Sequence, residues 1–203
     1  MDIGPHSRCT AFEGTQCVAS GELAQVALKA KGVVDGGKQV LIFDDVTSEA
    51  IEVDFRGTAA DVLSRLARSE SKETESAPGP EAEAPRGPGR PKLGVVAREV
   101  TLLPRHWDWL NGQPGGASVA LRKLVETARR ANEGKDRVRQ AQEAAYRFMS
   151  AMAGNQPGFE EATRALFAND ERRFDQLTEP WPIDIRSHAR KLAAVAFENP
   201  IAA

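Results

Sequence analysis

Residues 69–92 contain no apolar residue larger than alanine or proline, and this stretch constrains the fold more than any other part of the sequence. It is rich in Glu, Ser, Pro and Gly. Without large side chains to bury, such a segment lacks the favourable term that offsets the entropy of ordering the chain. We therefore expect a disordered linker here, preceded by a small α/β domain at residues 1–68.

Positive charge is concentrated at the end of the linker and just after it. Residues 86–130 hold nine Lys or Arg against three acidic residues, a net charge of +6 in a chain whose total is −2. Residues 1–85 carry −7 and residues 131–203 carry −1. An asymmetry of this size indicates a polyanionic partner, and we expect that partner to be DNA.

The basic segment begins with a short arm, Pro85-Arg86-Gly87-Pro88 followed by Gly89-Arg90-Pro91-Lys92. Gly and Pro leave the backbone extended and without bulk, so an arginine can enter a narrow minor groove, where the negative potential is enhanced. The arm resembles an AT-hook, which implies contacts from Arg86, Arg90 and Lys92 to A·T-rich DNA. A basic linker that touches no DNA explains the same residues.

A strand, a short helix, a tight turn and a longer helix are predicted within residues 93–131. The β-branched, apolar run at 95–103 predicts the strand, Pro104 suits the first position of a helix, and Asn111-Gly112 ends that helix. Ser118 is the predicted N-cap of the second helix, whose apolar residues recur at helical spacing: Leu121, Leu124, Val125 and Ala128. This layout resembles the ribbon-helix-helix proteins.

That resemblance implies an obligate dimer in which one strand from each subunit pairs into a ribbon that enters the major groove of DNA. Alternation would place Val96, Val100 and Leu102 in the dimer core, because the opposite register buries Glu99. The start of the second helix would direct free N–H groups at a phosphate. The candidate DNA contacts are then Arg98, Glu99 and Thr101 on the ribbon and Gly116, Ser118, Arg122 and Lys123 on the helix.

One departure from the ribbon-helix-helix pattern keeps a second function open. The outward ribbon face is Ala97, Glu99 and Thr101, whereas members of that family usually present Arg, Lys, Asn or Gln there. The alternative is a protein-interaction module, in which the strand-helix-helix segment only dimerises and the other regions bind protein partners.

Residues 9–68 predict a small unit of ββαββα topology. Glu13-Gly14 is the bend of the first strand pair, and alternation at 50–55 predicts a fourth strand. Thr58 caps the last helix, with Asp61 completing a capping box. We expect Cys17 to be a small core residue.

Residues 132–203 predict a helical C-terminal region. Its first helix carries apolar residues from Val138 to Met152, a short helix covers 159–167, Asp170 begins another, and Pro180-Trp181-Pro182 forms a rigid elbow. The polar residues after the elbow are expected to be solvated surface: Asp184, Arg186, His188 and Arg190.

The whole sequence resembles a bacterial family of about two hundred residues classed as a domain of unknown function. The resemblance rests on the CTAF-Glu-Gly start, the GRPKLGVVAREVTLLPRHWDWL block and the Trp-Pro-x-Asp-x-Arg-x-His motif near the C-terminus. It implies that the parts of the chain belong together, and it carries no activity.

No motif for an enzyme, a cofactor or a metal is present. The two cysteines and three histidines are scattered, and Asp44, Asp45 and Asp54 match no calcium loop, so we interpret them as solvated carboxylates at a hairpin end. No signal peptide and no apolar run of membrane-spanning length occurs, which favours a cytoplasmic protein with no membrane contact. The sequence therefore predicts an α+β protein that acts as a dimeric, DNA-binding transcriptional regulator.

Overall fold

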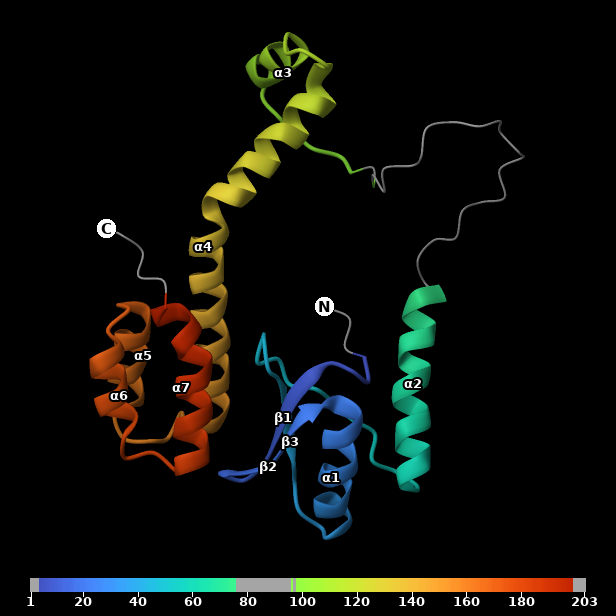
Figure 1. Cartoon of the computed structure of the whole chain (residues 1–203), viewed down its shortest axis with the longest axis vertical. Coiled ribbons are helices and arrows are strands. Elements are labelled where there is room, and N and C mark those ends of the chain that lie inside the picture. Colours follow the sequence, from blue (N-terminus) through green and yellow to red (C-terminus); the bar gives the residue numbers. More distant parts are fainter. Residues whose placement is uncertain (1–3, 76–95, 97, 199–203) are drawn as a thin grey trace. The chain divides into compact units, whose positions relative to one another are not determined.

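The computed structural model describes residues 4–75, 96 and 98–198, and it combines an antiparallel sheet with helices (Figure 1). The strands are β1 (Arg8–Glu13), β2 (Gln16–Glu22) and β3 (Leu41–Asp44). The helices are α1 (Leu23–Asp35), α2 (Ala59–Glu75), α3 (Pro104–Asn111), α4 (Gly116–Met152), α5 (Phe159–Phe167), α6 (Glu171–Thr178) and α7 (Ile183–Phe197). The predicted α+β class is confirmed.

The chain divides into two compact units. Unit 1 contains Met1–Ala77 and Gly134–Ala203, and unit 2 contains Pro78–Glu133. The N-terminal α/β part and the C-terminal helices, which the sequence presented as separate regions, thus lie in one unit. α2 also continues to Glu75, beyond the predicted start of the linker at residue 69.

The sheet has the order β2-β1-β3, with both pairs antiparallel. The predicted fourth strand is wrong: beyond a single bridge between Phe43 and Ala50, in which the Ile51 N–H donates to the Ile42 carbonyl at 2.8 Å, residues 52–56 pair with no strand in the described part of the chain. In this segment, side chains form hydrogen bonds with backbone groups that a β-ladder would otherwise use. The Arg56 N–H donates to the Asp54 carboxylate at 3.1 Å, and Arg65 donates to the carbonyls of Asp54 and Arg56.

Alternation along β1 gives the sheet two buried faces. Cys9 and Ala11 point to one face, where they join Ile42 and the apolar stripe of α1. Thr10 and Phe12 point to the opposite face and are equally buried. The sheet therefore needs a cover on both sides, and α1 supplies only one.

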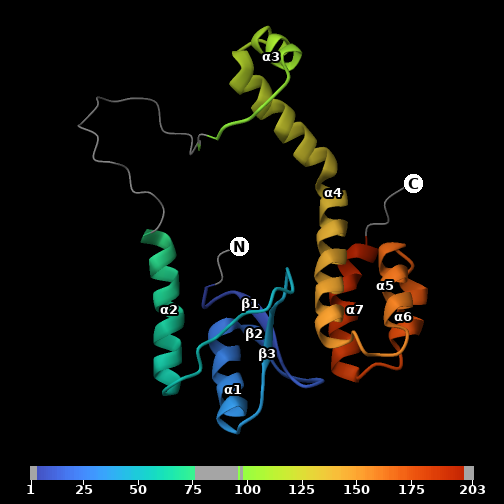
Figure 2. The same ribbon diagram turned by 180° about the vertical axis from the view of Figure 1, so that it is seen from behind.

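The second face is covered by the C-terminal helices, as Figures 1 and 2 both show. The Phe12 and Phe43 rings lie 5.3 and 5.4 Å from that of Phe148 on α4. These three residues belong to a core that also includes buried side chains of α5, α6 and α7. Unit 1 is consequently a sheet between α1 and a C-terminal helical layer.

Polar contacts also join the sheet to the helices of unit 1. The Cys17 N–H donates to the Asp184 carboxylate at 2.8 Å, and Lys191 lies 3.1 Å from Asp45. The expectation that Cys17 is a core residue is wrong, because its side chain is exposed. β2 is an edge strand, and at Cys17 its free edge meets the start of α7.

The expectation that His188 lies on the solvated surface is wrong, because only 7% of the residue is exposed. Its ring lies 5.3 Å from that of Phe12 and 4.5 Å from that of Phe148. It follows Ile185 by three residues and therefore shares the buried face of α7. Burial, together with the charge of Lys191, lowers the pKa of His188 to about 4.

The two helices of unit 2 meet at a turn that requires glycine. Gly115 and Gly116 have φ values of 88° and 74°, and a Cβ on Gly115 would lie 3.1 Å from the Val119 side chain. α4 begins at Gly116, so Ser118 lies in the first turn and is not the N-cap that the sequence predicted. α4 then continues unbroken to Met152, joining two predicted helices into one.

We predict that His188 makes unit 1 sensitive to acid. An imidazole with a pKa of about 4 in the folded chain and 6.5 in the unfolded chain is held neutral by folding, so the stabilising effect is complete above pH 6.5 and is lost as the pH falls toward 4. The expected loss in the free energy of unfolding is up to about 3 kcal/mol. Chemical denaturation of wild type and His188→Leu at several pH values measures it. The substitution should flatten this part of the profile, while His106→Ala, at an exposed histidine, should not; identical profiles for wild type and His188→Leu would contradict the prediction.

Two glycine substitutions, at Gly115 before α4 and at Gly134 inside it, should have opposite effects on stability. Gly115→Ala forces a positive φ on alanine against Val119 and should destabilise the turn by about 1 kcal/mol or more. Gly134 lies inside α4 with open space around its Cα, so Gly134→Ala should stabilise the helix by about 1 kcal/mol. Urea unfolding followed by tryptophan fluorescence and by circular dichroism measures both effects. An equal effect of the two substitutions would show that the backbone at Gly115 is not constrained.

Candidate nucleic-acid interface

The ten candidate DNA contacts fall into three stretches of the chain. Arg86, Arg90 and Lys92 lie outside the described residues. Three others precede α3, namely Arg98, Glu99 and Thr101, and all three are exposed. The remaining four are Gly116, Ser118, Arg122 and Lys123, within the first turns of α4. In the described residues, no hydrogen bond or ion pair joins the second stretch to the third.

The segment before α3 has its backbone groups available for pairing. Residues 98–102 have no regular secondary structure, and within the described chain they make no backbone hydrogen bond. Val96 and Val100 are 73% and 52% exposed. In the predicted ribbon, a second copy of the strand would supply these backbone hydrogen bonds. The single chain contains no such copy, so the ribbon stays a prediction.

α3 has the predicted start and buries one of its faces. Pro104 occupies the beginning of the helix, Leu110 is buried, and Trp107 is half-buried. Trp109 is 53% exposed, which sequence analysis did not single out. Trp109 follows Trp107 by two residues and therefore lies on the other side of the helix. That spacing could have predicted its exposure from the sequence.

The apolar stripe predicted for the start of α4 exists, and it faces solvent. Leu124 and Val125 are 48% and 64% exposed, Ala128 is exposed, and Leu121 is half-buried. In the C-terminal half of the same helix, Val138, Ala141 and Phe148 are buried. The contrast shows that the apolar spacing of α4 is used for packing in unit 1 and is left uncovered in unit 2.

The cations of α4 differ in how far they are already engaged. Glu126 accepts hydrogen bonds from Arg129 at 3.0 Å and from Arg130 at 2.8 Å, and those bonds lower the pKa of Glu126. Arg122 donates to the Ser118 carbonyl at 3.0 Å, but neither Arg122 nor Lys123 forms an ion pair in the part of the chain that the structure describes. These two charges are therefore the more available for a phosphate.

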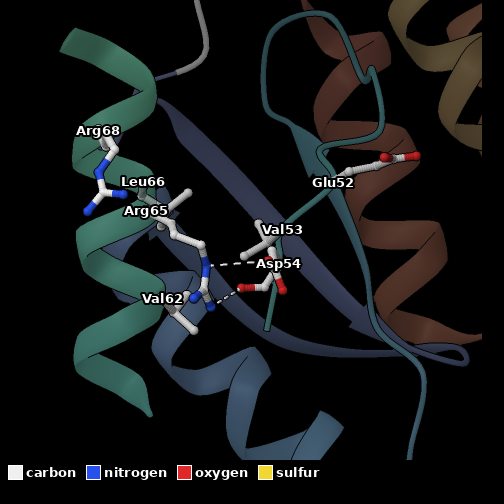
Figure 3. Close-up of a pocket in the computed structure, with 7 residues that line it drawn as sticks. All are labelled: Glu52, Val53, Asp54, Val62, Arg65, Leu66 and Arg68. Carbon is white, nitrogen blue, oxygen red and sulfur yellow. Dashed lines mark hydrogen bonds and ion pairs between the residues drawn. The ribbon is translucent and has the colours of Figure 1, made fainter. Parts of the chain in front are cut away.

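A hollow of about 310 Å³ in unit 1 lies between α2 and residues 52–54 (Figure 3). Arg65 extends from α2 toward Asp54, and its Nε lies 3.5 Å from the Asp54 carboxylate. Asp54 also accepts two hydrogen bonds from the Arg56 guanidinium, which hold its pKa well below the usual range. The cluster fastens α2 to residues 52–56. The charged side chains that line the hollow are balanced, with Arg65 and Arg68 against Glu52 and Asp54, so no net charge favours an ionic ligand.

Metal-binding clusters and membrane-spanning helices were the remaining candidates among the described residues, and neither occurs there. In residues 4–75, 96 and 98–198, no three His, Cys, Asp or Glu side chains gather as they would to hold a metal ion. None of the helices in that part of the chain has both the length and the apolar character needed to span a membrane.

Comparison with known proteins identifies a family but no characterised relative. No curated protein and no solved structure matches the chain. The family model described as "Uncharacterized protein conserved in bacteria (DUF2239)" matches residues 8–193, which include unit 2 and most of unit 1. This match confirms the resemblance to a bacterial domain of unknown function, and the chain belongs to that family.

Proposed function

We propose that the chain is a dimeric DNA-binding protein that acts as a transcriptional regulator, with residues 93–131 forming a ribbon-helix-helix-like core. The observation that carries the proposal is the exposed apolar stripe of α4, which lies beside cations that form no ion pair within the described residues. Leu124 and Val125 belong to the stripe, and Arg122 and Lys123 are the cations.

Dimerisation is supported by the exposure of apolar residues in unit 2. Val96, Val100, Leu124 and Val125 are each about half exposed or more, although their spacing is that of core positions. A second copy would cover them, and an antiparallel strand from that copy would satisfy the open backbone groups of residues 98–102. Within the described part of a single chain, these apolar residues have no cover and residues 98–102 have no strand partner.

DNA binding is supported by charge. Residues 86–130 carry a net charge of +6. Within them, the charge of Glu126 is shared by Arg129 and Arg130, to which it is hydrogen-bonded. The N-terminus of α4 is suited to a phosphate, because no atom lies within 4 Å of the position a Cβ would take on Gly116. The arm at Arg86, Arg90 and Lys92 adds an expected minor-groove contact and a preference for A·T-rich DNA.

A protein-interaction module is the second candidate function. It is favoured by Glu99, an exposed acid on the face that a ribbon would present to the major groove. In this alternative the apolar stripe of α4 still pairs with a second copy, and protein partners replace DNA. The dimer is common to both functions, so only the DNA measurements below separate them.

We predict a dimer that Val125→Lys dissociates. Val125 is 64% exposed in the single chain, so a lysine there leaves the fold of one chain intact, whereas burial against a second copy would make the added charge unfavourable. Light scattering at micromolar concentration should give twice 22.0 kDa for the wild type and 22.0 kDa for the variant. Leu28→Lys, at an exposed leucine of α1 in unit 1, is the matched control and should remain dimeric. A monomeric wild type would exclude the ribbon-helix-helix assignment.

We predict that DNA affinity depends on Arg122 and Lys123 more than on Arg129. Replacing either of the first two with Gln removes a phosphate contact, which should weaken binding on every duplex and reduce the slope of log affinity against log salt by about one unit. Arg129→Gln, whose guanidinium is held by Glu126, should change the slope less. Arg90→Ala should instead weaken binding most on A·T-rich duplexes.

Fluorescence anisotropy with A·T-rich and G·C-rich duplexes at several salt concentrations measures all of these variants together. If the wild type shows no salt-dependent binding to any duplex, DNA binding is excluded and the protein-interaction module takes its place.

A further inference from the structure

Unit 1 contains a mostly apolar groove that neither the fold nor the proposed DNA contacts use. The groove has a volume of about 330 Å³ and lies between the C-terminal half of α4, α7 and the loop that follows β3. Ala141, Ala144 and Leu192 are buried and line it, and Val46 and Val195 also line it but are 64% and 37% exposed. A volume of this size lies in the range of small-molecule sites, which are typically apolar with a few polar groups.

The loop that carries Val46 is held firmly in place. The Asp44 carboxylate accepts hydrogen bonds from the N–H groups of Val46 at 2.9 Å and Thr47 at 2.7 Å, and the Asp44 carbonyl accepts one from Ser48 at 2.9 Å. Arg147 on α4 donates to the Thr47 carbonyl. The exposed apolar side chain of Val46 is thus fixed beside the groove, which preforms one wall of the site.

Charge at the groove favours an anion. Asp45 lines the groove, but its oxygens already accept from Thr10 at 2.6 Å and from Lys191 at 3.1 Å, and only 8% of its side chain is exposed. Arg137 lines the groove, is exposed and forms no ion pair within the described residues. With Arg137 and Lys191 against Asp45, the groove has one uncompensated positive charge.

The neighbouring hollow sets the direction in which an anion would lie. It shares Val46 and Gln140 with the groove, and its charged lining residues are Glu49, Glu143 and Arg147. Two carboxylates against one guanidinium make that end less favourable for an anionic group than the end at Arg137. A guanidinium can bind a carboxylate through two parallel hydrogen bonds, which gives both strength and orientation.

We propose that this groove binds a small organic carboxylate. The carboxylate lies on Arg137, with Lys191 adding positive charge, and the apolar body of the ligand lies on Ala141, Ala144 and Leu192, covered by Val46. All of these residues belong to unit 1. The site therefore goes beyond the proposed DNA binding and does not depend on it.

The test compares two carboxylates with their uncharged amides, using the full chain near neutral pH. Benzoate and hexanoate are titrated against benzamide and hexanamide, and binding is followed by amide NMR shifts. We expect at least one carboxylate to shift residues 45–46, 137–144 and 191–195 and to bind about tenfold more tightly than its amide, a difference that one charge-assisted contact can supply.

Variants assign the two parts of the site. Arg137→Gln should lower the affinity for the carboxylate about tenfold and leave that for the amide unchanged. Arg139→Gln is the matched control, because Arg139 is on the same helix but is paired with Asp136 at 3.0 Å, and it should bind like the wild type. Ala144→Leu fills the groove and should abolish binding of both probes. If thermal unfolding shows that this variant is unstable, Val46→Glu, at an exposed position, tests the groove instead by placing a negative charge beside the ligand.

Three results would overturn the proposal. The first is the absence of shifts with all four probes at millimolar concentration. The second is equal affinity for acid and amide, and the third is unchanged carboxylate affinity in Arg137→Gln. None of these results bears on DNA binding, which is measured on duplexes and on residues of unit 2.

Discussion

The contact between Phe12 and Phe148 is the interaction on which unit 1 depends. Because side chains alternate along β1, burying Cys9 and Ala11 under α1 leaves Phe12 on the other face, where it needs a cover. Aromatic rings bury large areas and add a favourable ring contact, here at 5.3 Å. The segment that supplies the cover is more than 130 residues further along the chain, so the C-terminal helices are part of the same core as the sheet.

This arrangement has a consequence for the residues between the two parts of unit 1. Unit 1 contains the residues both before and after 78–133, so these residues are an insertion whose two ends are anchored in unit 1. The entropy of closing such a loop rises only slowly with its length, so a long insertion is tolerated. Unit 2 can therefore carry a partner-binding role of its own while the core around Phe12 and Phe148 holds the chain ends together.

Local features of the fold could be predicted from the sequence, and long-range ones could not. Thr58 and Asp61 form the predicted capping box, with the Thr58 N–H 2.8 Å from the Asp61 carboxylate, and Asp170 caps α6 through a hydrogen bond of 3.0 Å from the Arg173 N–H. Both depend on residues three apart. The burial of His188 depends on Phe12, which no spacing rule connects to it.

The continuity of α4 shows where local rules mislead. Asn132 and Gly134, which lie between the two predicted helices, are weak helix formers. Their combined penalty is on the order of 1 to 2 kcal/mol, whereas extending an existing helix adds a hydrogen bond per residue and avoids a second nucleation. α4 therefore stays helical through residues 129–135, even though these residues are all exposed and gain nothing from packing.

The same helix also separates the two proposed kinds of binding by the pattern of its charges. In unit 2, Arg122 and Lys123 lie beside an uncovered apolar stripe, and a repeating polyanion shared by two chains matches several cations at once. In unit 1, Arg137 is a single available cation beside a groove of about 330 Å³. One charge on an apolar wall suits one acid group on an apolar body. The proposed macromolecular partner therefore belongs at the first turns of α4 and the proposed small molecule at its later turns.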